Sequence, residues 1–470
     1  MVQIEQLDKS LKNQLYSDDP AKRSFAIESL MNEELDDEII EILCTFVEDA
    51  DKGIRNSVDM TLSFNPSPRI PIYLVKYISS QNISSRNLAG EILLKIGNKA
   101  VDVMIASIYN SSDDDKKFLI DILGLIGDPK SGSSILKILE INTNENVILA
   151  CIEALGNLKY TEALDKLFQT YEKNELYRPT IIEALGKIGS KKSLDFIMSK
   201  YNEEEELIKF SIIESLGLIG DEQSFYFLIS ELNETSSPII SPIIGSIFQL
   251  REKYNFDVPF DDRIKKAILQ TIYESEPQYK KAAVNLMSAF DDEEIIAACL
   301  KIYGEDVELD EIIKPKIYEK PLVLFSAMPS LIHELPDNLM KLLELTKEIL
   351  DENSVEIINT LAGIQRRNIS DSFTICLDNP DEEVRKLAVE LLFTVDQNIA
   401  ILFIDKMLDD DNLWNRLKLL ELLSTTNLPE AEAALIRMSN DPEEMISERA
   451  KFILFQKSVL QLETKQEDKK

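Results

Sequence analysis

Apolar residues recur along this chain with the three- and four-residue spacing of one face of a helix. The segment around residue 213 is typical, with Phe210, Ile213, Leu216 and Ile219 on one face. A break follows, and a second apolar helix is expected over residues 224–232. Glycine is scarce (14 residues) in a chain rich in Leu, Ile, Glu and Lys, which favours helix over strand. The basic element is therefore a pair of helices.

The pair repeats about every 31 residues. Its clearest copies surround Leu123, Leu155, Leu185 and Leu216, which follow one another at steps of 32, 30 and 31 residues. We call the equivalent residues anchor positions; the full set is Leu30, Leu62, Leu93, Leu123, Leu155, Leu185, Leu216, Ile247, Met287, Met328, Leu361, Leu392, Leu423 and Ile453. One helical pair cannot bury its apolar face alone, so the repeat predicts a stacked array of about 14 pairs.

Two sequence patterns carry a family resemblance. The stretch 378–395, DNPDEEVRKLAVELLFTV, and the copies of Glu-x-Leu-Gly-x-Ile-Gly resemble HEAT repeats. The short step is similar to the bacterial HEAT-like repeats typified by phycobilisome lyases. The resemblance implies an all-α fold, an α-α superhelix (an armadillo-like HEAT-repeat solenoid) in which the second helix of each pair lines the concave face. It also implies that the anchors are buried and that the residue two positions earlier faces outward.

The repeats predict a single continuous solenoid followed by a short tail. The solenoid is expected over 1–460 and a charged C-terminal tail over 461–470. Within the solenoid, the repeats are regular over 10–250, irregular and longer over 251–345, and regular again over 346–458. In the irregular part the anchor steps lengthen to 40 and 41 residues. We interpret the extra length as two inserted loops, over 251–260 and 303–321.

Cap residues predict where several helices begin and end. Asp19, Asn379 and Asp441 each precede a proline, as an N-cap residue does before the first helical turn, and Glu382 and Glu444 follow the last two caps at capping-box spacing. At the other helix end, glycine follows several anchors. Glycine directly after the anchor either favours close approach of neighbouring helices or helps to end the helix, and glycine two to four residues later favours a C-terminal cap, as at Gly127, Gly189 and Gly220.

The position two residues before the anchor is acidic in many copies. We call this set the acidic row: Glu91, Asp121, Glu153, Glu183, Glu214, Glu390 and Glu421. The first copy has Glu28, and the second copy is off register by about one residue, with Asp59 nearby. One interpretation is structural, since glutamate favours helix and pairs four residues along, as Glu91 does with Lys95 and Glu183 with Lys187. The other is a negative groove for a basic peptide or protein.

The acidic row is interrupted in the middle of the chain. Its positions there are Gly245, Asn285, Ser326 and Asn359. The helix expected over 235–250 also lacks charge, and the longer steps fall in the same region. One hypothesis is a partner site with an apolar floor and aromatic anchors, for which Tyr254, Phe256 and Phe260 are candidates. The alternative is a bend at which these aromatic residues pack against their own helices.

Charge and composition limit the possible chemistry. Lys and Arg total 51 against 84 Asp and Glu, a net charge of −33, which argues against nucleic-acid binding. The chain has one histidine and four widely separated cysteines, so we expect no metal site, buried reduced thiols and a cytoplasmic protein. No nucleotide-binding or nucleophile motif occurs, and we assign no catalytic residue and no cofactor. No secretory signal or membrane span is expected either.

These observations favour a non-enzymatic scaffold or adaptor that binds another protein along its concave face. The alternative is a lyase or chaperone-like enzyme on a HEAT scaffold, as the resemblance allows, although no catalytic residue of that family can be matched in this chain. A HEAT-type DNA repair glycosylase would need a basic groove, and the acidic row has the opposite sign.

Overall fold

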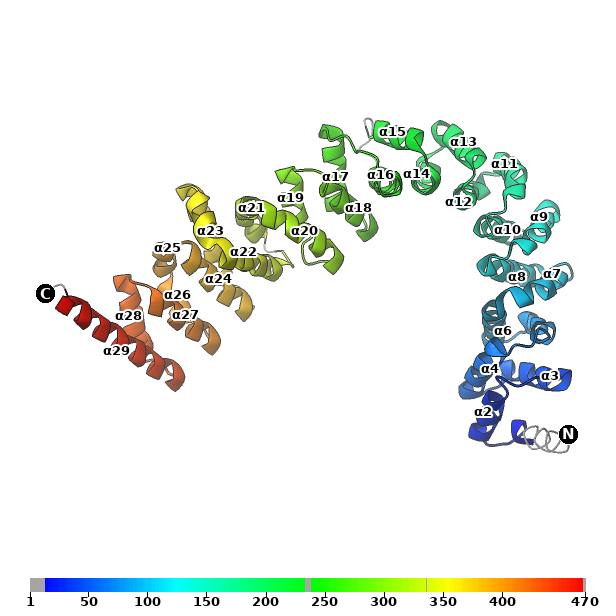
Figure 1. Cartoon of the computed structure of the whole chain (residues 1–470), viewed down its shortest axis with the longest axis horizontal. Coiled ribbons are helices and arrows are strands. Elements are labelled where there is room, and N and C mark those ends of the chain that lie inside the picture. The colour runs from blue at the N-terminus through cyan, green and yellow to red at the C-terminus, as the bar shows by residue number, and fades with distance from the viewer. Residues whose placement is uncertain (1–12, 233–237, 335, 468–470) are drawn as a thin grey trace. The chain divides into compact units, whose positions relative to one another are not determined.

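The computed structural model describes residues 13–232, 238–334 and 336–467, and every regular element in these ranges is a helix (Figure 1). The expected all-α fold of stacked helical hairpins is confirmed. The chain divides into two compact units, residues 1–256 (unit 1) and 257–470 (unit 2), which are described separately. The division into one solenoid and a tail stays a prediction.

Unit 1 consists of two rows of helices. The row that carries the anchors contains α2 (Pro20–Ser29), α4 (Lys52–Phe64), α6 (Ile83–Ile96), α8 (Asp113–Ile126), α10 (Glu145–Asn157), α12 (Arg178–Ile188), α14 (Glu206–Ile219) and α16 (Ile240–Tyr254). The second row contains α3 (Asp37–Thr45), α5 (Ile70–Leu74), α7 (Val101–Ile108), α9 (Gly132–Ile141), α11 (Leu164–Lys173), α13 (Lys191–Lys200) and α15 (Glu222–Glu231). Each helix of the anchor row packs against the next one in that row. From α8 to α16, the anchor row lies on the inner side of this unit (Figure 1).

Short 3-10 helices supplement the connections in unit 1. They span Phe46–Glu48, Val75–Ser79, Gly97–Ala100, Pro129–Ser131, Thr161–Ala163, Glu175–Tyr177 and Tyr201–Glu203. These single turns lead directly into or out of the α-helices, so the hairpins of unit 1 are joined by very little irregular chain.

The anchors are buried, as predicted. Leu123, Leu155, Leu185 and Leu216 are fully shielded from solvent. The glycine after each of them lets the next helix come close. A Cβ on Gly156 would lie 2.8 Å from the Cα of Ala184 in α12, and a Cβ on Gly124, Gly186 or Gly217 would lie 2.9 Å or less from an atom of the following anchor helix. The predicted role of these glycines in close helix packing is confirmed.

Hydroxyl groups fix the register between neighbouring anchor helices. The Ser215 hydroxyl donates to the Ile182 carbonyl at 3.2 Å and the Ser246 hydroxyl to the Ile213 carbonyl at 2.8 Å. In both bonds the hydroxyl precedes its anchor by one residue, and the carbonyl precedes its own anchor by three.

The same bond corrects the predicted register of the second copy. The Thr61 hydroxyl donates to the Ile27 carbonyl at 3.0 Å, with the same offsets from Leu62 and Leu30. The second copy is therefore in register, and its acidic-row position is occupied by Met60 rather than by Asp59.

Helix ends agree with the glycine prediction in part. Gly127 and Gly189 end α8 and α12 in the left-handed conformation, with φ of 74° and 70°. Gly220 also ends a helix, α14, but its φ is −58°, so its backbone is not left-handed. In α10 the equivalent residue is Lys159, which adopts φ of 52° and donates its N–H to the Gly156 carbonyl. A lysine thus occupies a conformation that favours glycine.

Only one of the three predicted N-caps is confirmed. The Asp19 side chain accepts from the Ala21 N–H, and Pro20 is the first residue of α2. Asn379 and Asp441 instead accept from the N–H two residues along, in loops that precede the helices. The caps at these two positions were wrong, as was the capping-box role of Glu382 and Glu444, which are the first residues of α24 and α29. The Asx turn satisfies the backbone before the helix starts.

Unit 2 also contains two rows. One comprises α17 (Asp262–Glu274), α19 (Glu293–Cys299), α21 (Pro321–Glu334), α23 (Gly363–Cys376), α25 (Gln397–Leu402), α26 (Ile404–Leu408) and α28 (Pro429–Met438). The other comprises α18 (Pro277–Met287), α20 (Val307–Glu319), α22 (Leu339–Thr360), α24 (Glu382–Val395), α27 (Leu413–Thr425) and α29 (Glu444–Glu467). α21 packs against α23, and α22 against α24.

One predicted insertion is partly wrong and the other is wrong. Residues 251–254 belong to α16, so only 255–260 of the first segment is a loop. The segment 303–321 was expected to be a loop, but most of it forms α20. This helix contains Pro315, and its exposed face is densely charged, which hid its apolar positions Leu309, Ile313 and Ile317. Because this helix was missed, the predicted anchor Met328 was assigned to the wrong row of helices. Met328 is buried in α21, whereas the anchor Met287 lies in α18 of the other row.

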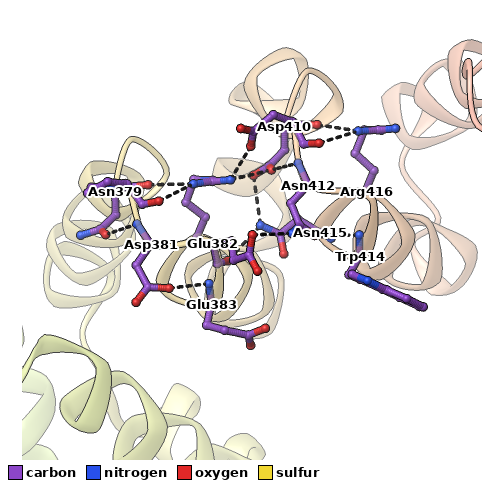
Figure 2. Close-up of polar contacts among 12 residues, drawn as sticks. Asn379, Asp381, Glu382, Glu383, Asp410, Asn412, Trp414, Asn415 and Arg416 are labelled. Carbon is purple, nitrogen blue, oxygen red and sulfur yellow. Dashed lines mark hydrogen bonds and ion pairs between the residues drawn. The ribbon is translucent and has the colours of Figure 1, made fainter.

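Arginine–aspartate pairs join successive hairpins of unit 2, and Figure 2 shows the polar contacts around Asp410, including the bond from Arg416 to its carbonyl. Arg385 contacts the Asp410 carboxylate with two nitrogens, at 2.8 and 3.0 Å, and donates to the Asn379 carbonyl at 3.0 Å. Arg416 repeats the arrangement with Asp441, at 3.0 and 3.2 Å, and with the Asp410 carbonyl at 2.8 Å. Each arginine therefore joins its own loop to the loop 25 residues ahead.

Candidate protein-interaction surfaces

The acidic row has five of its seven members in unit 1, each on a different anchor helix. Glu91, Glu153, Glu183 and Glu214 are exposed, and Asp121 is half-buried. They lie on α6, α8, α10, α12 and α14 in chain order. From α6 to α14, the side of the anchor helices that faces away from the core therefore carries one carboxylate per helix.

Close packing of the helices brings these carboxylates near one another. Neighbouring helix axes are typically about 8–10 Å apart, and glycine at the contact favours the lower end of that range. The same offset holds at each junction from α8 to α14, so Asp121, Glu153, Glu183 and Glu214 recur at one level. A spacing close to the Debye length of about 8 Å at physiological salt leaves their fields only partly screened.

Lysines neutralise part of the row, in agreement with the structural interpretation. Lys95 contacts Glu91 and Asp59, each at 2.7 Å, and Lys187 contacts Glu183 at 2.7 Å. Both predicted pairs four residues apart are thus confirmed. These ion pairs are exposed and contribute little stability, roughly 0.3–0.5 kcal/mol for a helical pair.

The two remaining members of the row lie in unit 2. Glu390 in α24 is mostly buried, with 13% of its side chain exposed, and lies 3.5 Å from Lys347 and 3.7 Å from Lys418. Glu421 in α27 is exposed and lies 3.3 Å from Lys418. Lysines therefore compensate both members of the row in unit 2, as they compensate Glu91, Asp121 and Glu183 in unit 1, where Lys117 lies 2.7 Å from Asp121.

The four non-acidic positions of the middle segment fall in different environments. Gly245 is buried in α16. Asn285 is half-buried in α18, and its amide donates to the Lys281 carbonyl at 2.8 Å. Ser326 and Asn359 are exposed, on α21 and α22. Because α21 belongs to the other row of unit 2, Ser326 and Asn285 do not share a row of helices.

Two of the candidate aromatic anchors pack within unit 1. Phe256 lies 5.0 Å from Phe225 of α15 and 5.1 Å from Tyr254, measured between ring centroids. Phe260 belongs to unit 2, where it stacks on Phe290 at 4.5 Å. These contacts are those that the packing interpretation expects. Tyr254 and Phe260 each keep 44% of their surface exposed, so a partner role for them stays a prediction.

The sequence interpretation missed an open groove of about 890 Å³ in unit 1, at the C-terminal ends of α8, α10, α12 and α14. Lys159, Lys187 and Lys253 line it together with Leu125 and Leu218, and none of the described residues that line it is acidic. Lysines at helix C-termini complement the partial negative charge of the carbonyl ends. One sequence feature could have pointed to the lysines of this groove, because α10 has Lys159 at the position where other copies have glycine.

The cysteines are all free and buried. Burial raises the pKa of each thiol, Cys44, Cys151, Cys299 and Cys376, to about 12, so all four are protonated at neutral pH. In the described part of the chain, no group of three or more Cys, His, Asp or Glu side chains is placed to hold a metal ion. Nor does any described helix combine the length and apolar character needed to cross a bilayer.

The chain is similar to solved structures at 12–14% sequence identity. No protein-family model and no curated protein sequence matches the chain. It is similar to a chain in a structure of Kap95p binding to RanGDP, with 14% identity, a TM-score of 0.42, and coverage of 96% of this chain and 69% of that one. For a chain in a Kap95:Nup1 complex the identity is 12% and the TM-score is 0.42, with coverage of 96% of this chain and 72% of that one. For a Kap121p mutant the identity is 12% and the TM-score is 0.42, with coverage of 98% of this chain and 65% of that one. The solenoid assignment therefore rests on the helices of this chain, and the subclass of short bacterial HEAT-like repeats stays a prediction.

Proposed function

We propose that this protein is a non-enzymatic scaffold that binds another protein along the exposed side of the anchor helices of unit 1. The observation that carries the proposal is the row formed by Asp121, Glu153, Glu183 and Glu214, held in register by glycine contacts between successive helices. A rigid row of like charges at regular spacing attracts an extended segment that presents lysine or arginine at matching intervals.

The partner we propose is a basic peptide segment. Salt at physiological concentration screens the attraction between single exposed charges. Several carboxylates that act together keep more of their attraction for a basic segment than a single exposed carboxylate does. The four buried free thiols fit a reducing compartment, so we place the protein and its partner in the cytoplasm.

A pair of charge-matched variants tests the proposal. The row variant carries Asp121→Asn, Glu153→Gln, Glu183→Gln and Glu214→Gln. The control neutralises four exposed carboxylates of the second helix row, with Glu140→Gln, Asp165→Asn, Asp195→Asn and Glu222→Gln. Both variants have the same net charge, so they differ only in where the charge is removed.

The measurement is fluorescence anisotropy of a labelled deca-lysine peptide at 0.15 M salt. We expect the row variant to bind about tenfold more weakly than the wild-type protein, since each lost contact is worth up to about 1 kcal/mol. The control should bind within about twofold of the wild type. Equal weakening in the two variants would mean that binding follows net charge alone, and the proposal would be wrong.

A further inference from the structure

Unit 2 contains a pocket of about 450 Å³ where α20 ends, α21 begins and α22 bends. Pockets of roughly 300–1,000 Å³ are the size that encloses a ligand or a protruding side chain. Its lining residues come from the irregular part of the chain, 251–345, and from the repeat that follows it, and none of them is a partner-site candidate named from the sequence.

The bend in α22 shapes the pocket. Asn353 has φ of −140° and ψ of 32°, which is not helical, so the helix changes direction at this residue. Ile349, Asn353 and Ile357 follow one another at four-residue spacing and all line the pocket. The bend therefore turns one face of α22 toward the junction of α20 and α21.

The floor of the pocket is apolar. Ile349 and Ile357 are buried, with 2% and 4% of their surface exposed. Leu322 and Tyr318 line the pocket from the junction, and Leu322 keeps 39% of its surface exposed. A ligand that covers Leu322 gains from the removal of its exposed apolar surface from water, whereas Ile349 and Ile357 are already shielded.

The lining carries net negative charge. Glu293, Glu319 and Glu356 line the pocket, and the one lysine among the lining residues, Lys320, is already paired with Asp291 at 2.8 Å. Glu319 contacts Lys316 of its own helix.

The other two carboxylates are available to a ligand. Within the described part of the chain, neither Glu293 nor Glu356 has an ion-pair partner, and no lining residue brings a further positive charge. The C-terminal end of α20 adds the partial negative charge of its last carbonyl groups.

From this combination we propose that the pocket binds a cationic side chain of a partner protein, an arginine or lysine next to an apolar residue. The cation lies between Glu293 and Glu356, and the apolar part covers Leu322. An acidic ligand would meet carboxylates of its own charge, and a purely apolar one would leave them without a partner. The inference rests on the proposed function in that the partner is a basic protein, but it concerns a separate surface in unit 2.

Disulfide tethering tests the pocket locally. Thr360 lines the pocket and is exposed, so Thr360→Cys places a reactive thiol at its edge. The four native thiols are buried and protonated and do not compete. The variant is incubated with a symmetrical disulfide that carries an alkyl guanidinium on each half, or with its neutral alkyl urea isostere, at a fixed concentration of 2-mercaptoethanol, so that the thiolate introduced at residue 360 takes one half and the other half leaves as a thiol. Capture by thiol–disulfide exchange is then read by intact mass spectrometry.

We expect the guanidinium half to be captured about tenfold more than the urea half, as two carboxylates at about threefold each would give. The preference should disappear in Thr360→Cys with Glu293→Gln and Glu356→Gln. It should persist with Glu311→Gln, which removes an exposed α20 carboxylate outside the pocket. Asn398→Cys, elsewhere in unit 2, measures the background preference for cations.

Capture at residue 360 that does not exceed the background would overturn the inference. So would a preference that survives the loss of both glutamates. Because this readout is confined to residue 360 in unit 2, it is independent of the peptide-binding test of the row in unit 1. A failure of one therefore leaves the other standing.

Discussion

Gly156 illustrates how single residues set the distance between helices in unit 1. Its missing side chain lets α10 lie against the backbone of Ala184 in α12, and the same contact recurs between Gly124 and Ala154 and between Gly186 and Ser215. The helices therefore meet through small side chains, and the larger anchors fill the core beside them. This residue-scale packing is what places the carboxylates of the acidic row at a regular spacing.

Gly156→Ala should lower the free energy of unfolding by about 1–3 kcal/mol, because the added Cβ meets backbone rather than a side chain that can move. Urea denaturation followed by circular dichroism measures the change. Gly363→Ala is the control, since a Cβ there has nothing within 4 Å. It should leave stability unchanged or raise it by up to about 1 kcal/mol. Equal effects of the two substitutions would contradict the close-packing account.

Lys159→Gly should have the opposite effect. The lysine adopts φ of 52°, where a side chain is strained, and glycine relieves that strain at the cost of a more flexible unfolded chain. We expect a net gain of about 0.5–1 kcal/mol in the same denaturation experiment. Lys137→Gly, in the middle of α9, should instead lose about 1 kcal/mol. A loss at both positions would show that Lys159 is not strained.

At the scale of helices and loops, the arginine–aspartate pairs of unit 2 join one hairpin to the next. Burial by itself would raise the pKa of Asp410, but hydrogen bonds from Arg385, from the Asn412 N–H and from the Asn415 amide outweigh it, and the pKa lies below its usual value. The folded protein therefore binds this proton less tightly than the unfolded chain does. The resulting stabilisation is complete above the unfolded pKa of about 3.9 and is lost as pH falls through the lower folded value.

Asp410→Asn should cost about 2 kcal/mol at pH 7, because Arg385 and Asn415 lose a mostly buried charged partner. The difference from wild type should stay constant down to about pH 5 and shrink below about pH 4. Urea denaturation across this pH range measures it. Asp409→Asn, which removes an exposed carboxylate 3.6 Å from Arg437, should change stability by less than about 0.5 kcal/mol. A pH-independent loss in Asp410→Asn would contradict the pairing account.

Elements with strong periodicity were predictable and those with mixed signals were not. The anchors from Leu93 to Leu216 could be placed because apolar spacing, an acidic residue and a glycine all coincide in each copy. α20 was missed because Pro315 and many charges mask its three buried positions. The caps at Asn379 and Asp441 were displaced because an Asx turn and a helix N-cap use the same residue types.

The candidate sites were less predictable than the fold. The acidic row is visible in the sequence because its spacing follows the anchors. The pocket of unit 2 is not visible, because it depends on the bend at Asn353 and on side chains from α19, α20, α21 and α22. No single stretch of sequence carries that combination.

For the whole molecule, the main question is whether its net charge of −33 acts as a diffuse field or through a defined surface. A diffuse field would attract any basic partner to any exposed carboxylate. A defined surface would instead concentrate binding on one side of the anchor helices of unit 1, where the carboxylates keep a fixed spacing, and this is the outcome we expect.

Carbodiimide cross-linking of deca-lysine to the wild-type protein is the most direct measurement, because it joins a lysine amine only to a carboxylate in contact with it. Peptide mapping by mass spectrometry then locates the links. Binding to the acidic row predicts links concentrated at Asp121, Glu153, Glu183 and Glu214. Links spread in proportion to exposure over Glu140, Asp165, Asp195 and Glu222 of the second helix row would contradict it.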